Sequence, residues 1–270
     1  GQRREGPLLP FGFGSNPTLR RKFNDAARDF PPLQADLSRW LGTATTYADL
    51  GSFQEMLETI QEEADTALVR CMTAQYSNQP EADRLRRVFR ALYEVHLSDC
   101  TADATRCEMI LIECRKTLEF FFRELAKAYP LQGVSNSMSQ NDRDFNSTLI
   151  CQAASDVGLA TPPESFQRVT KGQVRSVSEY DDAWRLRPLI VATLLAARQA
   201  PNHPLRDVAS QTPDLLTTLD DVASVAGSAS HVNEQSWAFE DLSKTVNDLT
   251  HMICLFRNLP HQNLADVLNG

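Results

Sequence analysis

Glycine is scarce in this chain, at 11 of 270 residues or about 4%, where roughly 7% is usual. Few glycines leave few positions for tight turns or for loops that wrap a phosphate, so the composition favours long helices. Long apolar runs are missing too. The longest, residues 189–197, is far shorter than the ~20 residues that cross a bilayer. It predicts a buried helix, and no membrane contact is expected.

The six cysteines form no CxxC pair and are too sparse for a small disulfide scaffold. Cys100, Cys107 and Cys114 recur every seven residues, which on one helix places neighbours about 10 Å apart, too far for one zinc ion or a disulfide. We interpret them as core residues, and reduced thiols indicate an intracellular protein, cytoplasmic or nuclear. The five histidines are scattered, so no metal site or cofactor is predicted.

Sequence motifs of common enzymes are also absent. The chain has no GxSxG, no Walker-type loop and no GxGxxG, so it offers no nucleophile elbow and no phosphate-binding loop of a known type. This favours a protein that is not an enzyme.

Apolar residues at alternating three- and four-residue spacing are the clearest positive feature. One stripe joins Cys107, Leu111, Cys114, Leu118, Phe121 and Leu125, and another joins Leu242, Val246, Leu249, Ile253 and Phe256. This spacing places side chains on one face of an α-helix, which must pack against another surface. The sequence therefore predicts an all-α protein, either a multi-helix bundle or a short stack of helical hairpins, with eight to ten helices.

Composition divides the chain into four parts. Residues 1–15 predict a flexible N-terminal arm, 16–130 a first helical subdomain, 131–146 an aperiodic polar loop or linker, and 147–270 a second helical subdomain. The chain starts at Gly1 and shows no signal-peptide pattern, so we expect a fragment of a larger intracellular protein.

Local signals mark where several helices are expected to start. These are Asn16-Pro17, the capping box Ser52 and Glu55, Pro80, Thr101, Ser147, Ser178 with Asp181 before a kink or restart at Pro188, Thr212-Pro213 and Asn233. A shorter helix is expected over 33–41 and another around 164–169. The helix over 101–129 is predicted to be apolar on more than one face and so to lie centrally.

Charge argues against non-specific nucleic-acid binding, because 27 basic and 35 acidic residues give a net charge of −8. The densest positive patch consists of Arg84, Arg86, Arg87 and Arg90. Acidic residues interrupt it. We interpret it as a solvated helix face or as a groove for a short acidic segment of a partner, with RNA or DNA binding by the same arginines as an alternative.

Arg90 and His96, in the segment RALYEVH, resemble the arginine-to-histidine spacing of nucleases of the HEPN class. That resemblance implies metal-independent RNA cleavage, in which the pair would polarise the phosphate and transfer protons. Six residues on a helix separate the two side chains by about 120°, however. A half-buried His96, with Arg90 paired to Glu94 four residues on, is the competing interpretation.

Trp40, Trp184 and Trp237 each lie near an expected helix end. Each either closes the end of the core or, if exposed, anchors a partner surface. We therefore expect a non-enzymatic helical protein–protein interaction or scaffold module whose partner is a helix or a short acidic peptide segment. A HEPN-like ribonuclease using Arg90 and His96 is the alternative enzyme, and a nucleic-acid-binding helical module is the third possibility.

Overall fold

A computed structural model describes residues 47–98, 104–132, 142–179, 185–228 and 237–269. The chain divides into two compact units, Gly1–Glu63 and Ala64–Gly270. Of the first unit, only residues 47–63 are described, and they belong to a helix. The expected arm over 1–15, the start at Asn16-Pro17 and the helix over 33–41 lie outside the described residues. All contacts reported below are within the second unit.

The fold class predicted from the apolar spacing is confirmed, since the described residues form eleven α-helices, one 3-10 helix and no strand. The α-helices are α3 (Tyr47–Cys71), α4 (Ala82–Ser98), α5 (Ala104–Ala128), α6 (Asp142–Val157), α7 (Glu164–Gln167), α8 (Lys171–Glu179), α9 (Leu186–Gln199), α10 (Pro204–Gln211), α11 (Leu215–Ser228), α12 (Phe239–Phe256) and α13 (Leu264–Asn269), and the 3-10 helix is η2 (Ala74–Asn78). The count within the described residues is one above the range expected for the whole chain, and it includes α10 and α13, two short helices for which the sequence analysis predicts no start.

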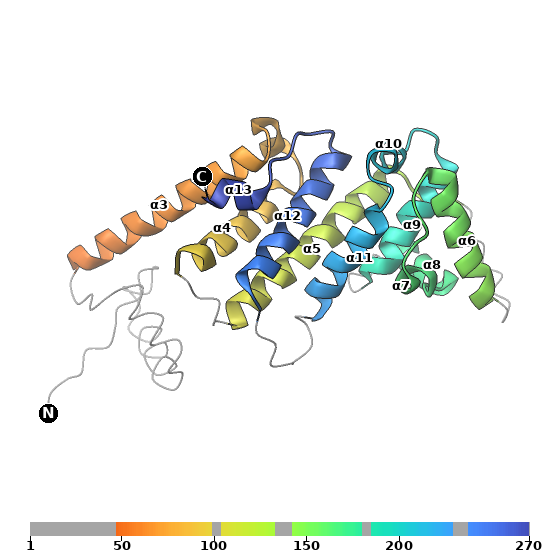
Figure 1. Ribbon diagram of the computed structural model, residues 1–270, viewed down its shortest axis with the longest axis horizontal. Helices are drawn as coiled ribbons and strands as arrows, with labels where there is room; N and C mark the ends of the chain where they lie inside the picture. Colours follow the sequence, from red (N-terminus) through yellow and green to blue (C-terminus); the bar gives the residue numbers. More distant parts are fainter. Residues whose placement is uncertain (1–46, 99–103, 133–141, 180–184, 229–236, 270) are drawn as a thin grey trace, which may run out of the picture. The chain divides into compact units, whose positions relative to one another are not determined.

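Helix α5 lies at the centre of the second unit (Figure 1). It packs against α4 and α12 on one side and against α9 and α11 on the other. Its expected stripe is fully buried at Cys107, Leu111, Cys114 and Leu118. Phe121 of the same stripe is also buried, and Ile110 and Phe122 extend the buried surface beyond the stripe. A helix that is apolar on several faces must be covered on several sides, which explains its central position.

Helix α9 organises the other end of the unit. Its apolar run, residues 189–197, is buried except at Leu195, as predicted, and it packs against α5, α6, α7, α8, α10 and α11. Buried apolar residues before and after residues 133–141 belong to a single hydrophobic core, which extends from Ala67 to Val267. Within the described residues, no helix combines the length and the apolar character that spanning a membrane requires.

Several helix boundaries differ from expectation. Helix α3 begins at Tyr47, so Ser52 of the expected capping box lies within the helix rather than at its start. Helix α6 begins at Asp142, inside the segment expected to be a linker. Ser178 lies in the last turn of α8 instead of opening a helix, and the expected start at Asn233 lies outside the described residues. Capping residues are common in helix interiors too, so a two-residue pattern misplaces some boundaries.

Candidate functional site

The expected basic patch on α4 is paired within the chain rather than open. Arg86 lies 2.6 Å from the Asp83 carboxylate on the same helix. Arg87 lies 3.8 Å from the Glu113 carboxylate of α5. Such exposed pairs contribute little to stability, but they balance the positive charge of the patch.

The other two arginines of the patch also contact groups of this chain. The Arg84 guanidinium lies over the ring of Phe120, 4.8 Å from its centroid. Arg90 donates to Asp65 of α3 at 2.8 Å, so the expected pairing with Glu94 is wrong. Asp65 is 25 residues away in the sequence, a separation that helical spacing does not reveal.

His96 lies in the last turn of α4, where its ring packs on Phe239 at 5.3 Å between centroids. It lines a cavity of about 500 Å³ formed with residues of α12 and with the segment 263–268. Arg90 contacts Asp65 instead, so the structure gives the two candidate nuclease groups different neighbours. Within the described residues, no group of three or more His, Cys, Asp and Glu side chains could hold a metal ion.

Trp237 is partly buried and packs against the hydrophobic core just before α12. This position fits the interpretation of Trp237 as a residue that closes the end of the core. Trp40 and Trp184 lie outside the described residues.

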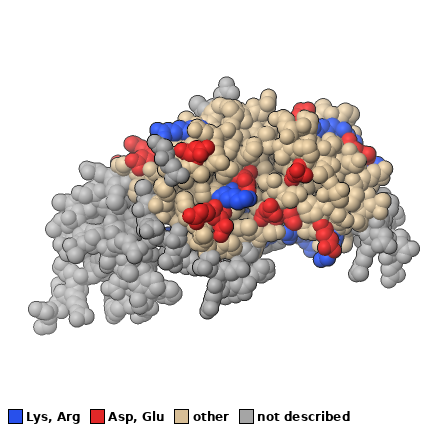
Figure 2. Space-filling model, in the orientation of Figure 1, with Lys and Arg blue, Asp and Glu red and all other residues tan. Residues whose placement is uncertain are grey.

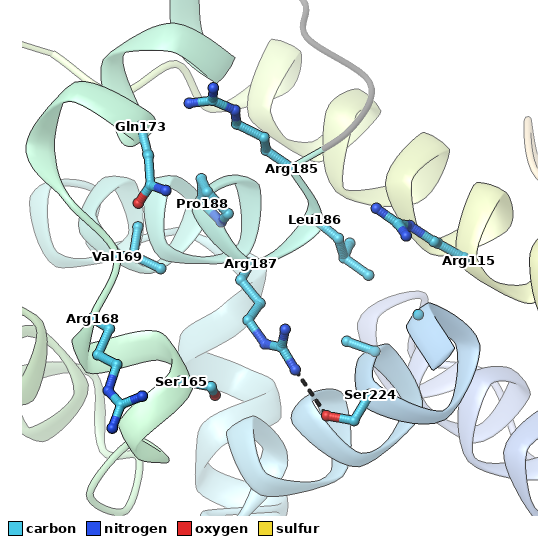
Figure 3. Close-up of a pocket in the computed structure, with 12 residues that line it drawn as sticks. Arg115, Ser165, Arg168, Val169, Gln173, Arg185, Leu186, Arg187, Pro188 and Ser224 are labelled. Carbon is cyan, nitrogen blue, oxygen red and sulfur yellow. Dashed lines mark hydrogen bonds between the residues drawn. The ribbon is translucent and has the colours of Figure 1, made fainter. Parts of the chain in front are cut away.

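A cavity with a volume of about 720 Å³ lies where α5, α7, α8, α9 and α11 come together (Figure 3). We call it the arginine pocket. Its lining residues are Arg115, Ser165, Arg168, Val169, Gln173, Arg185, Leu186, Arg187, Pro188, Ala223, Ser224 and Gly227. Four of them are arginines, and none of the described lining residues is Asp or Glu.

The start of α9 forms one wall of the arginine pocket. Arg185 is the N-cap residue, but its side chain makes no capping hydrogen bond, and no acidic residue lies in the first turn of α9. Pro188 is compatible with this position because the first turn of a helix does not need its missing N–H. The first N–H groups of a helix have no partner within the helix and carry partial positive charge. The helix end therefore adds to the positive character of the pocket.

Arg187 extends from α9 across the middle of the pocket to α11 (Figure 3). Its Nε donates to Asp220 Oδ1 and its Nη2 donates to Ser224 Oγ, both at 2.8 Å. These two bonds hold the guanidinium in place. Among the described residues, Nη1 has no hydrogen-bond partner, so its N–H groups remain available to a ligand.

Arg115 projects into the pocket from α5, while Arg168 and Arg185 extend away from Arg187 at its edge (Figure 3). Arg115 donates to Glu119 at 3.0 Å. Burial raises the pKa of Glu119, and the hydrogen bond from Arg115 opposes that shift. Arg168 pairs with Glu164 one turn earlier, and its side chain is 73% exposed. Arg168 can therefore turn towards a ligand at little cost.

One neutral side chain, that of Gln173, adds hydrogen-bond donors to the pocket. Gln173 and Thr170 form a capping box at the start of α8, in which Gln173 Oε1 accepts from the Thr170 N–H at 2.8 Å. The amide NH₂ of Gln173 then lies on the side facing Pro188 (Figure 3). Ser165 Oγ is buried and has no partner among the described residues. The protein itself covers this oxygen, so a ligand in the open pocket does not contact it.

The pocket contrasts with the acidic surface over α11 and α12 (Figure 2). There Lys244 donates to Asp248 at 2.6 Å, and this hydrogen bond, with the charges of Asp221 and Asp241, raises the pKa of Lys244. Carboxylates outnumber bases on that surface. The arginine pocket thus gathers four guanidinium groups, three of them paired with carboxylates of the chain, on a protein whose net charge is negative.

Comparisons with protein-family models, with curated proteins and with solved structures find no match to this chain. The geometry of the site therefore carries the functional argument alone. Sequence reasoning missed the four pocket arginines. The one local signal was Arg185-Leu186-Arg187-Pro188, two arginines at the start of a helix, whereas nothing near Arg115 or Arg168 marks them.

Proposed function

We propose that this chain is a non-enzymatic helical interaction module that binds a short acidic segment of another protein in the arginine pocket. The observation that carries the proposal is the lining of the pocket, which holds four arginines and no carboxylate among the described lining residues. Three of these arginines bond to carboxylates outside the lining, namely Asp220, Glu119 and Glu164. The partner is the one expected from the sequence, but the binding site differs from the α4 patch. The pocket arginines line a cavity, and within the described residues Arg187 Nη1 keeps its N–H groups available although Nε bonds to Asp220.

Arginine suits this role because its planar guanidinium binds carboxylates through two parallel hydrogen bonds. Arginine is also enriched among the residues that contribute most to protein interfaces. A volume of about 720 Å³ accommodates several atoms of a bound segment beyond one carboxylate. The acidic remainder of the surface repels acidic segments elsewhere, which favours the pocket over non-specific sites.

The other functions expected from the sequence receive less support. Ribonuclease activity would need Arg90 and His96 to act on one phosphate, and Arg90 donates to Asp65 while His96 packs on Phe239. Nucleic-acid binding would need the α4 arginines, which are already engaged by Asp83, Glu113, Asp65 and the Phe120 ring.

The direct test is binding of a fluorescein-labelled hexaglutamate peptide to the full chain, followed by fluorescence anisotropy. We expect saturable binding that weakens as salt is added. Arg187→Gln should reduce the affinity at least tenfold, because hydrogen bonds to charged groups are worth about 1.5–3 kcal/mol. Arg168→Gln, on an exposed side chain, should reduce it less.

Arg86→Gln is the matched control, since it also removes an arginine that bonds to an aspartate, but on α4. It should leave the affinity unchanged, and a labelled hexaserine peptide should not bind. Thermal unfolding of each variant checks that Arg187→Gln still folds without its bond to Asp220. Binding that is equal in the wild type and in both pocket variants would contradict the proposal.

A further inference from the structure

The donors of the arginine pocket face a ligand from several sides. Arg187 Nη1 and the first N–H groups of α9 lie on one wall. The Gln173 amide comes from α8 and Arg115 from α5 (Figure 3). They combine charged, amide and main-chain donors, and they do not lie in one plane.

This arrangement suits some anions better than others. A carboxylate accepts hydrogen bonds in one plane, through two oxygens, and a single bidentate arginine satisfies most of its needs. A phosphate monoester has three strong acceptor oxygens arranged in three dimensions and carries a charge of about −1.5 to −2 at pH 7. Arginine clusters and the N-termini of helices are the two features that proteins commonly use for phosphate.

We infer that the arginine pocket binds a phosphate monoester more tightly than a carboxylate. The inference rests on the proposed function and deepens it, because it makes the preferred segment of the partner a phosphorylated one. Arg187 is the central binding residue for the phosphate. Its Nε bond to Asp220 and its Nη2 bond to Ser224 fix the guanidinium before any ligand arrives, so little side-chain entropy is lost on binding.

The test is competition against the labelled hexaglutamate peptide on the full chain. The competitors are phosphoserine with both ends blocked, inorganic phosphate, and glutamate with both ends blocked, all at one ionic strength. We expect blocked phosphoserine to displace the peptide at a concentration at least tenfold lower than blocked glutamate. Direct calorimetric titration of blocked phosphoserine should show binding that Arg187→Gln weakens at least tenfold and that Arg86→Gln leaves unchanged.

Each other outcome has a definite meaning. Displacement by blocked glutamate at the same or lower concentrations overturns the preference for phosphate and leaves the acidic-segment proposal standing. Inorganic phosphate that competes as well as blocked phosphoserine supports phosphate chemistry but assigns it to the free ion, which overturns the phosphorylated segment. If neither the peptide nor any phosphate compound binds, the proposed function fails as well.

Discussion

His203 shows how one buried side chain sets the response of the protein to acid. It is the N-cap residue of α10, where its Nδ1 accepts from the Leu205 N–H at 3.1 Å, and its ring packs on Tyr129. Burial lowers the pKa of His203 to about 4, and the Arg206 charge adds to the shift. The folded protein therefore requires the neutral imidazole, because a protonated Nδ1 could not accept that hydrogen bond.

We predict that stability falls as the pH drops from 6.5 towards 4. The pKa of His203 is lower in the folded state, so its contribution is complete above its unfolded value of about 6.5 and is lost as the pH falls to about 4. The shift corresponds to about 3 kcal/mol. His261, whose pKa is lowered to about 4 by burial and then by His251, adds in the same direction. Urea unfolding at pH 7 and pH 4.5 measures the loss.

His203→Asn is the control for this prediction, since asparagine is a good N-cap residue and does not titrate in this range. Carboxylates titrate near pH 4 in both proteins, so the difference between the two isolates the histidine. The variant should lose distinctly less stability than the wild type between pH 7 and 4.5. Equal losses would show that His203 does not govern the acid response.

At the scale of single elements, α5 is the helix on which the others depend. Phe122 is 1% exposed and lies edge-on to the rings of Phe121 and Phe256, at 5.5 and 5.9 Å between centroids. Phe122→Ala should lower the free energy of unfolding by about 3–5 kcal/mol, the usual cost of removing a buried aromatic ring. Phe120→Ala on the same helix should cost clearly less, because Phe120 is only partly buried beneath Arg84. Urea unfolding curves of the two variants measure which substitution costs more stability. A larger loss for Phe120→Ala than for Phe122→Ala would contradict the central position of α5.

Much of α5 could be predicted from sequence, and little of the pocket could. The spacing of Cys107, Leu111, Cys114 and Leu118 is a local property of the chain, and local periodicity determines which face of a helix is buried. The pocket depends instead on how five helices pack, and Arg115 is 72 residues from Arg187. Tertiary packing brings the residues around the pocket together, and no short pattern in the sequence reveals that packing. For the same reason, helical spacing suggests Glu94 as the partner of Arg90, whereas in the structure Arg90 bonds to Asp65.

At the scale of the whole second unit, one core joins the helices on both sides of residues 133–141. We predict that α4 and α9 unfold together in a single transition. Leu85→Ala in α4 and Leu194→Ala in α9 remove fully buried side chains, and each should lower the stability of both helices by a similar amount. Native-state hydrogen exchange with mass spectrometry reads the two helices separately. If each substitution lowered the hydrogen-exchange protection of its own helix alone, the result would instead favour two subdomains divided near 131–146.

The contact between Glu81 and Arg257 joins two residues that the ribosome synthesises far apart in time. Glu81 is fully buried, and its carboxylate accepts from Arg257 Nε at 3.0 Å and from Arg257 Nη2 at 2.9 Å, across 176 residues. A buried carboxylate without its partner is strongly destabilising. On the ribosome, the start of α4 therefore cannot close over Glu81 until residue 257 has left the exit tunnel. Every shorter nascent chain leaves this corner open to water and to chaperones, so the unit cannot finish folding before α12 has been translated.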